Sequence, residues 1–377
     1  MIRHYQASLE QKYSGACIVK VAIFGGSGVV GRALLEHLMK ENIPAVALAR
    51  RAPDLLGANF VSLDLLDPKQ CENVVKTHLH DVTHVVYAAL FEQPGLISGW
   101  QDDQQMQTNL TMLSNIMAPL KTVETLEHIT LLQGTKAYGA HIAPMRIPGR
   151  EREPRHPHNN FYWLQEDLLN AEAARQGWRF TIWRPQIIFG HALNAPMNLL
   201  AALGVYAALQ AHQGSSLAYP GGPSGVMEAI DANLLARAIC FAWSHPGFDN
   251  ETFNITNGDV FTMEDIWPVL NDLFNLEPGP VEPQLLAATC YDREAIWSDI
   301  VSQHKLKPYT IRQVVGDSFF YADALLNARG SAPPPPSVLS TIKLRKAGFS
   351  DCIDTEDMLR NWFGKLQSMK ILPSPAR

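Results

Sequence analysis

Short apolar segments alternate with amphipathic segments over the first half of the chain. The apolar segments are expected as strands, at residues 21–24, 44–49, 60–65, 84–89, 128–132 and 180–190. Helical patterns lie between them, at residues 32–40, 68–79, 101–126 and 161–176. Continuous apolar strands are typical of parallel sheets that are covered on both faces. Strands alternating with helices at this spacing indicate an α/β fold, a doubly wound parallel sheet with right-handed crossovers.

The pattern changes beyond residue 190. Helices are expected at 195–213, about 231–243 and 262–274, a strand with a turn at 253–259, and largely helical structure at about 275–345. A proline run at 333–336 is expected as an extended connector. These segments are too irregular for a second full sheet. The pattern therefore predicts a smaller, mostly helical lid over the carboxyl ends of the strands, where doubly wound sheets bind ligands.

Glycines cluster where the first strand ends and the first helix begins. Gly25 lets the chain reverse, Gly28 lets backbone N–H groups approach a pyrophosphate, and Gly31 lets the helix pack close to the strand. A phosphate would then lie at the positive end of the helix. Because the cluster lies between a strand and a helix, it predicts a dinucleotide-binding loop rather than an ordinary turn.

The end of the second strand indicates which dinucleotide is bound. Arg50 and Arg51 stand where an NAD-binding chain carries an acidic residue for the ribose 2′-hydroxyl. Guanidinium groups hold a phosphate by charge-assisted hydrogen bonds, so the pair predicts NADP(H). At the end of the third strand, Asp64 is either an acceptor for the adenine amino group or a solvated loop residue.

These elements divide the chain. We expect an N-terminal arm at 1–17 and an NADP-binding Rossmann domain at 18–190, with returning segments at about 226–262. The remaining segments, 191–225 and 263–377, are expected to form the mostly helical, substrate-binding part.

Composition excludes several kinds of partner. The chain has a formal net charge of -6, a pI of about 6.1 and no basic block, which argues against a nucleic-acid or polybasic membrane surface. Its five cysteines are far apart and show no Cys-x-x-Cys spacing, so neither a disulfide framework nor a metal site is indicated. No apolar run approaches the roughly 18 residues of a membrane span. We therefore expect a cytoplasmic protein that acts on a small molecule.

The usual catalytic pattern of short-chain reductases is missing. That pattern has a serine or threonine after the fifth strand and Tyr-x-x-x-Lys on the next helix. Here Gly134 stands at the expected serine position, Lys136 follows two residues later, and Tyr162 is followed four positions on by Glu166.

The chain resembles the progesterone 5β-reductase and iridoid synthase-like family, extended short-chain dehydrogenases that reduce activated enones. The motif Asn-Phe-Tyr at 160–162 with the downstream Glu-Asp at 166–167 is seldom seen outside that family. The matching segments are residues 21–31, 49–51, 133–138, 160–167, 184–190, 253–261 and 343–349. The resemblance covers most of the chain, from about residue 18 to residue 370.

The resemblance implies roles for particular residues. The family's catalytic lysine falls on Lys136 and its catalytic tyrosine on Tyr162. Its nucleotide contacts fall on Ser27, Gly28, Val29, Arg50, Arg51, Asp64 and Leu65, with Ile187 beside the nicotinamide. The implied reaction is 1,4-reduction of an α,β-unsaturated carbonyl by NADPH, and a homodimer is suggested by the family alone.

On this interpretation, hydride adds to the β-carbon and negative charge builds on the carbonyl oxygen as an enolate. The Tyr162 phenol and the Lys136 ammonium would donate to that oxygen, and solvent could protonate the α-carbon. Candidate apolar walls of the pocket are Phe91, Trp100, Met197 and Tyr206. Tyr138 either adds to the pocket wall or simply packs, and Asn109 either braces backbone or touches substrate.

Two alternatives remain at this point. One is a nucleotide-sugar epimerase or carbonyl reductase, which would require the Tyr-x-x-x-Lys pattern that Tyr162 lacks. The other is a redox-sensing NADP-binding protein without turnover, against which the joint presence of Lys136 and Tyr162 argues.

Overall fold

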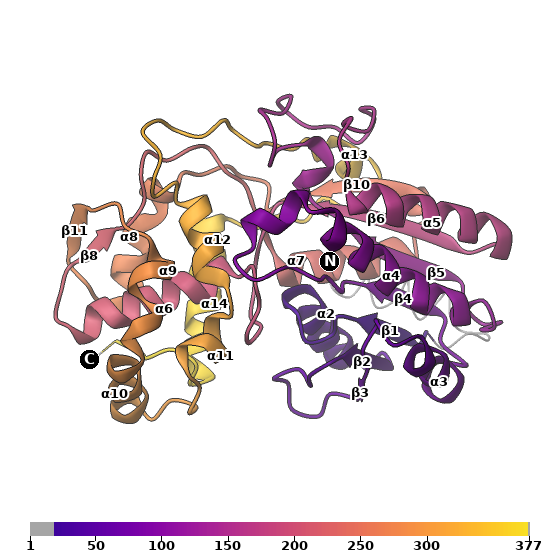
Figure 1. Cartoon of the computed structure of the whole chain (residues 1–377), viewed down its shortest axis with the longest axis horizontal. Helices are drawn as coiled ribbons and strands as arrows, with labels where there is room; N and C mark the ends of the chain where they lie inside the picture. The colour runs from indigo at the N-terminus through magenta and orange to yellow at the C-terminus, as the bar shows by residue number, and fades with distance from the viewer. Residues whose placement is uncertain (1–18, 376–377) are drawn as a thin grey trace.

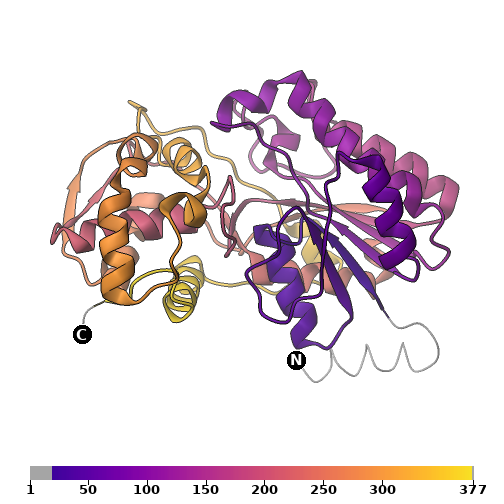
Figure 2. The same ribbon diagram turned by 60° about the horizontal axis from the view of Figure 1, so that its bottom comes forward.

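The computed structural model describes residues 19–375, and the arm expected at 1–17 lies outside the described residues. A sheet flanked by helices lies beside a smaller, mostly helical part, here called the lid (Figures 1 and 2). The Rossmann-type α/β architecture expected from the apolar pattern is confirmed.

The central sheet has seven parallel strands in the order β10-β6-β5-β4-β1-β2-β3. The order reverses between β1 and β4, which are paired with Val21 opposite His84. In open α/β sheets such a reversal forms the crevice where ligands bind. The strands are β1 Val21–Phe24, β2 Ala45–Ala49, β3 Phe60–Ser62, β4 His84–Tyr87, β5 His128–Leu132, β6 Arg179–Pro185 and β10 Glu251–Ile255.

Helices cover both faces of the sheet. On one face α3, α4 and α5 enclose a core of aliphatic side chains, and on the other α2 packs against α7, with α13 beside β10. The bounds are α2 Val29–Lys40, α3 Pro68–His78, α4 Asp103–Leu120, α5 Phe161–Gln176, α7 Ala232–Trp243 and α13 Ile342–Lys346. Short 3₁₀ helices are η1 Ile97–Gln101, η2 Thr135–Tyr138 and η3 Pro246–Phe248.

The lid is built around one helix, α6 Leu199–His212, which is apolar on all sides because other lid helices surround it. Its core includes Trp267, Trp297, Phe319 and Trp362. The other helices are α8 Met263–Phe274, α9 Leu286–Thr289, η4 Tyr291–Arg293, α10 Glu294–His304, α11 Ile311–Val315, α12 Ser318–Leu325 and α14 Thr355–Ser368. Two short strands, β8 Leu217–Tyr219 and β11 Pro278–Val281, pair at its edge.

Several expected elements differ from the structure in their bounds, and two of them bear on the site. The helix expected over 101–126 begins at Asp103 and ends at Leu120, with its start capped by the Asp102 side chain. The segment expected over 180–190 as a strand and its exit loop holds two strands, of which β6 ends at Pro185. The chain continues as β7 Ile187–Phe189, which pairs with β9 Ala229–Asp231 outside the main sheet.

Candidate active site

The glycine loop after β1 has the geometry of a phosphate cradle. Gly25 has a φ of +80°, and a Cβ there would lie 2.6 Å from the Ala88 carbonyl oxygen. A Cβ at Gly31 would collide with the carbonyl oxygen of Gly25. Gly28 caps α2 without a side chain over the first amides, and Ser27 and Val29 flank it. The loop and the positive end of α2 therefore fit a pyrophosphate.

The two arginines expected to hold a 2′-phosphate lie at the end of β2. Arg50 and Arg51 directly follow β2 and are exposed. With the Asn194 amide turned so that its oxygen faces the guanidinium, Arg51 donates to it through both terminal nitrogens, Nη2 at 3.2 Å. Asn194 lies on the segment that enters the lid. The arginine pair is thus beside the lid and still open to an anionic ligand.

The other expected nucleotide residues lie at the same end of the sheet. The Asp64 carboxylate accepts from the Leu66 amide at 3.0 Å, and the Leu65 carbonyl accepts from the Asn115 side chain at 2.9 Å. Ile187 is the first residue of β7 and is 9% exposed.

The backbones of Lys136 and Tyr162 are tied together by Asn160, the residue that caps the start of α5. The Asn160 side-chain oxygen accepts from the Tyr162 amide at 3.0 Å, and its nitrogen donates to the Lys136 carbonyl at 3.0 Å. Asn160 was expected within the Asn-Phe-Tyr motif but with no role of its own. An asparagine directly before an apolar helix is an N-cap signal, so this role was open to sequence reasoning.

The Lys136 side chain occupies a largely buried position. Its Nζ atom lies 3.3 Å from Oε1 of Glu92 and 4.1 Å from the centroid of the Trp100 ring. Burial lowers the pKa of Lys136, and the Glu92 charge opposes that shift. Glu92 was not among the expected site residues, although it lies in the loop that follows β4.

The Tyr162 hydroxyl is placed to act as a donor. The residue is 8% exposed, and burial raises its pKa further than any nearby charge does, so the phenol keeps its proton at neutral pH. A Cβ at Gly134 would lie 3.3 Å from the Tyr162 hydroxyl oxygen, which explains the glycine at the expected serine position. Tyr321 of α12 is close enough for its phenol to raise the pKa of Tyr162 as well. Tyr321 was not among the residues expected from the sequence.

Glu166 fills the place of the missing lysine. One carboxylate oxygen accepts from Gln133 at 3.0 Å and lies 3.5 Å from the Arg184 guanidinium, while the other accepts from Arg155 at 2.8 Å. The Glu166 carboxylate, four residues after Tyr162, therefore belongs to a polar network between α5 and β6. It has no ammonium to offer a ribose.

The expected pocket residues near β4 differ in what they do. The Trp100 ring lies against the Lys136 ammonium, with its centroid 4.1 Å from Nζ. Phe91 is held by Asn109, whose side chain accepts from the Phe91 amide and donates to the Phe91 carbonyl, both at 2.9 Å. Of the two alternatives for Asn109, the structure shows backbone bracing.

The other three expected wall residues lie deeper or farther along the chain. The Tyr138 hydroxyl donates to the Asn254 side chain at 2.6 Å, so this residue packs from η2 against β10. Tyr206 is 1% exposed inside the lid core and donates to the Ala218 carbonyl at 3.0 Å. Met197 is half-buried just before α6.

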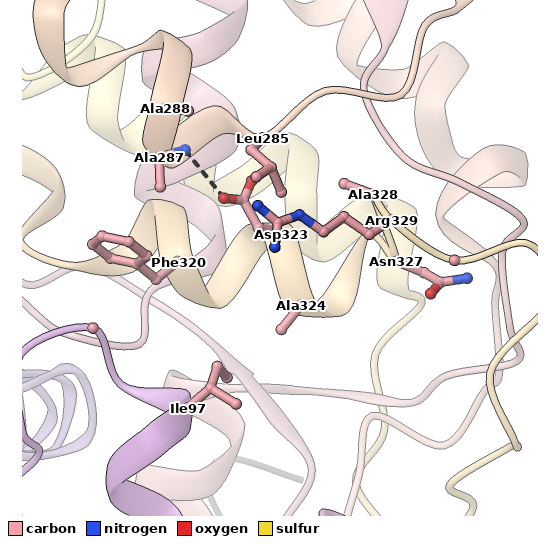
Figure 3. Close-up of a pocket in the computed structure, with 12 residues that line it drawn as sticks. Ile97, Leu285, Ala287, Ala288, Phe320, Asp323, Ala324, Asn327, Ala328 and Arg329 are labelled. Carbon is pink, nitrogen blue, oxygen red and sulfur yellow. Dashed lines mark hydrogen bonds between the residues drawn. The ribbon is translucent and has the colours of Figure 1, made fainter.

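A cavity of about 590 Å³ lies between the lid and the loop after β4. Figure 3 shows Ile97 of η1 facing Phe320 and Ala324 of α12, with Arg329 along one side. The Asp323 carboxylate accepts from the Leu286 and Ala287 amides at 2.6 and 3.1 Å. Because η1 also carries Trp100 and α12 also carries Tyr321, the cavity lies on the same two elements that flank Lys136 and Tyr162.

Two kinds of feature are absent from residues 19–375. No group of three or more His, Cys, Asp or Glu side chains there is arranged to hold a metal ion. None of the helices in that range is long and apolar enough to cross a membrane.

The class of protein follows from a family comparison. The model of the NAD dependent epimerase/dehydratase family matches residues 21–256, which include the glycine loop, Lys136, Tyr162 and β10. The chain belongs to this family. Solved structures agree at the level of the fold: UDP-glucose 4-epimerases from Thermotoga maritima and Thermus thermophilus, the latter in complex with NAD, superpose with TM-scores of 0.66 and 0.64 at 16% and 15% identity. Each comparison covers 93% of this chain and 99% of the other.

Curated relatives narrow the comparison within the family. The (S)-8-oxocitronellyl enol synthase of Antirrhinum majus is 29% identical over 93% of this chain and 92% of its own length. The 3-oxo-Delta(4,5)-steroid 5-beta-reductase of Arabidopsis thaliana is 28% identical over 93% and 92%. The resemblance inferred from the sequence motifs is confirmed.

Proposed function

We propose that the chain is an NADPH-dependent reductase of the C=C bond of α,β-unsaturated carbonyl compounds. One observation carries the proposal: Asn160 ties the backbones of Tyr162, whose buried phenol is protonated, and of Lys136, whose ammonium is buried, while Glu166 replaces the lysine of the usual short-chain pattern. The names of the curated relatives, an enol synthase and a steroid 5-beta-reductase, support the same reaction class.

The residues present fit a nicotinamide dinucleotide. The cradle at Gly25 and Gly28 would hold the pyrophosphate, and Ile187 would lie against the nicotinamide. The exposed Arg50 and Arg51 support NADPH over NADH, because a 2′-phosphate would receive charge-assisted hydrogen bonds there. When bound, NADPH supplies the hydride that is added to the β-carbon of the substrate.

Tyr162 and Lys136 have one task, which is to stabilise the enolate. Charge builds on the carbonyl oxygen as hydride reaches the β-carbon, and donors aimed at that oxygen lower the barrier. The phenol is a donor because its raised pKa keeps it protonated. The ammonium adds charge in a site from which water is largely excluded. Solvent can protonate the α-carbon, so no proton relay through a ribose-bound lysine is needed.

The substrate is proposed to be a small apolar enone or enal. The cavity beside the site is lined largely by aliphatic and aromatic groups, including Ile97, Leu285 and Phe320. An apolar body would gain from burial there, while its carbonyl oxygen reaches Tyr162 and Lys136.

A cytoplasmic homodimer is also proposed. The free state of the four described cysteines, Cys71, Cys240, Cys290 and Cys352, supports a reducing compartment. The dimer rests on the family resemblance, and light scattering of the purified chain tests it.

The testing experiment is NADPH consumption with a panel of enones, here 2-cyclohexen-1-one, a monoterpene dialdehyde and progesterone, with NADH in parallel. We expect wild type to saturate the C=C bond and Tyr162→Phe to lose about a hundred- to a thousandfold in kcat. The matched control is Tyr206→Phe, which removes a phenol in the lid core.

Two outcomes would contradict the proposal. If NADPH binds but no enone is reduced, the redox-sensor alternative replaces it. If the chain instead interconverts nucleotide sugars, the epimerase alternative does. Product analysis by mass spectrometry separates C=C reduction from carbonyl reduction, since the first gives a saturated carbonyl compound and the second an allylic alcohol.

A further inference from the structure

Glu92 is a buried carboxylate that the reaction described above does not use. Its side chain is 1% exposed, and Oε1 lies 3.3 Å from the Lys136 Nζ atom. Burying an ionised carboxylate is costly unless it is paired and hydrogen-bonded. A carboxylate in this place therefore needs a reason beyond local stability.

The Glu92 side chain is held rigidly from the side opposite to Lys136. Oε2 accepts from the Gln105 side-chain nitrogen at 2.6 Å. The Gln105 side-chain oxygen in turn accepts from the Gln93 amide at 2.8 Å, and a Cβ at Gly99 would collide with that oxygen. Gln105 is 1% exposed, so the segment after β4 is folded around this one carboxylate.

The ammonium is fixed on two sides. Glu92 lies on one side, and the face of Trp100 lies 4.1 Å from Nζ on another. An ammonium has three N–H groups, and among residues 19–375 Glu92 is the one side chain that accepts from Lys136. The remaining N–H groups are thus available to a substrate oxygen. Because the pair is neutral overall, it also suits a pocket that takes an apolar substrate.

Of the groups around this pair, the imidazole and the two phenols keep their neutral forms, and Arg184 is a cation. The titratable or charged groups near the pair or near Tyr162 include His141 after η2, Tyr162 on α5, Arg184 on β6 and Tyr321 on α12. Burial lowers the pKa of His141 to about 4, and burial raises the pKa of both phenols. Burial also raises the pKa of Glu92 and lowers that of Lys136, so as the pH rises Lys136 is the group here whose loss of a proton would change the site.

We propose that Glu92 is a positioning residue of the reaction, which holds the Lys136 ammonium charged and fixed against Trp100 so that it can donate to the enolate oxygen. This role rests on the proposed function. Without the carboxylate, burial would favour the neutral amine, which is a weaker donor and carries no charge. Glu92 thus acts on the reacting atoms through Lys136.

The first arm of the test measures Lys136 without catalysis. Wild type and Glu92→Gln are labelled with acetic anhydride across a pH series, and acetylation of Lys136 is followed by mass spectrometry. Since an opposite charge within about 4–6 Å shifts a pKa by about 1–3 units, the midpoint for Lys136 should fall by that amount in the variant. The matched control is Glu172→Gln, which removes the carboxylate of another glutamate–lysine pair, with Lys121 at 2.9 Å, on α5.

The second arm measures enone reduction against pH. The alkaline limb of kcat should move to lower pH in Glu92→Gln, by the same amount as the labelling midpoint, while KM for NADPH stays the same. Glu92→Asp keeps the charge and should restore most of the wild-type profile. Thermal unfolding of each variant checks that it is folded.

The outcomes separate this inference from the proposed function. An active wild type whose labelling midpoint is the same with and without Glu92 overturns the inference alone. The same holds if the midpoint moves but the alkaline limb does not. A wild type that reduces no enone overturns the proposed function, and the positioning role falls with it even if the labelling midpoint moves.

Discussion

The Asn160 side chain donates a 3.0 Å hydrogen bond to the Lys136 carbonyl and also caps the helix that begins with Phe161. The Asn160 side-chain amide therefore links two segments. One is the start of α5, which carries Tyr162, and the other is the 135–138 turn, which carries Lys136. The distance along the chain between the two proposed catalytic residues makes this tie necessary, because the intervening segment has little regular structure.

We predict that Asn160→Ala reduces kcat more than its loss of stability explains. Loss of the cap should cost about 1 kcal/mol, and the freed Lys136 backbone should lower kcat by about tenfold or more. Chemical denaturation and steady-state kinetics on one preparation measure the two effects. Asp354→Ala is the control, because Asp354 caps α14 in the lid. Equal kcat in both variants would contradict the prediction.

The arginines after β2 should decide the choice of cofactor. Changing both Arg50 and Arg51 to Ala removes the charge-assisted hydrogen bonds expected for a 2′-phosphate, each worth about 1.5–3 kcal/mol. KM for NADPH should rise by about a hundredfold or more, and KM for NADH should hardly change. Parallel kinetics with both cofactors measure this, with Arg360→Ala on α14 as the control. An equal rise for both cofactors would place the pair outside the 2′ site.

The glycine at the expected serine position should be intolerant of a side chain. In Gly134→Ser the new Cβ would lie 3.3 Å from the Tyr162 hydroxyl oxygen, so the phenol must move. A displacement of this kind lowers kcat by about tenfold to a hundredfold. Gly247→Ser, where a Cβ meets nothing within 4 Å, is the control. Wild-type rates in Gly134→Ser would show that Tyr162 has room that the structure does not give it.

An ion pair between the nucleotide-binding part and the lid should make stability depend on acid pH. Burial alone would raise the pKa of Glu36, but hydrogen bonds from Lys365 of α14 and from Lys40 lower it to about 2. A lowered carboxyl pKa gives stability that is present above the unfolded value of 4.5 and is lost as the pH falls towards 2.

The melting temperature of wild type should therefore fall between pH 4.5 and pH 2 more steeply than that of Glu36→Gln. Differential scanning fluorimetry across this range measures the difference. Glu251→Gln, which removes a more exposed pair with Lys343, should follow the wild-type curve closely. Parallel curves for wild type and Glu36→Gln would mean that the pair does not couple the two parts.

Local sequence was enough for the sheet and the dinucleotide loop. The strand–turn–helix at 21–40 depends on short-range sterics, since Gly25 needs a positive φ and Gly31 a bare Cα. Arg50 and Arg51 were expected at a 2′-phosphate because a Rossmann unit fixes the number of residues between the glycines and the end of the second strand. Lys136 and Tyr162 came from motifs that the family resemblance identified.

Only the tertiary structure decided what surrounds those residues. Glu92 and Trp100 both contact the Lys136 ammonium, and Glu166 pairs with Arg184. The β7 strand pairs outside the main sheet, and Tyr321 of the lid lies near Tyr162. Hydrophobic periodicity and turn chemistry act over a few residues, so the sequence reveals them directly. Burial, pKa shifts and buried ion pairs depend on which distant segments pack together, and that is determined only once the lid and the sheet have folded against each other.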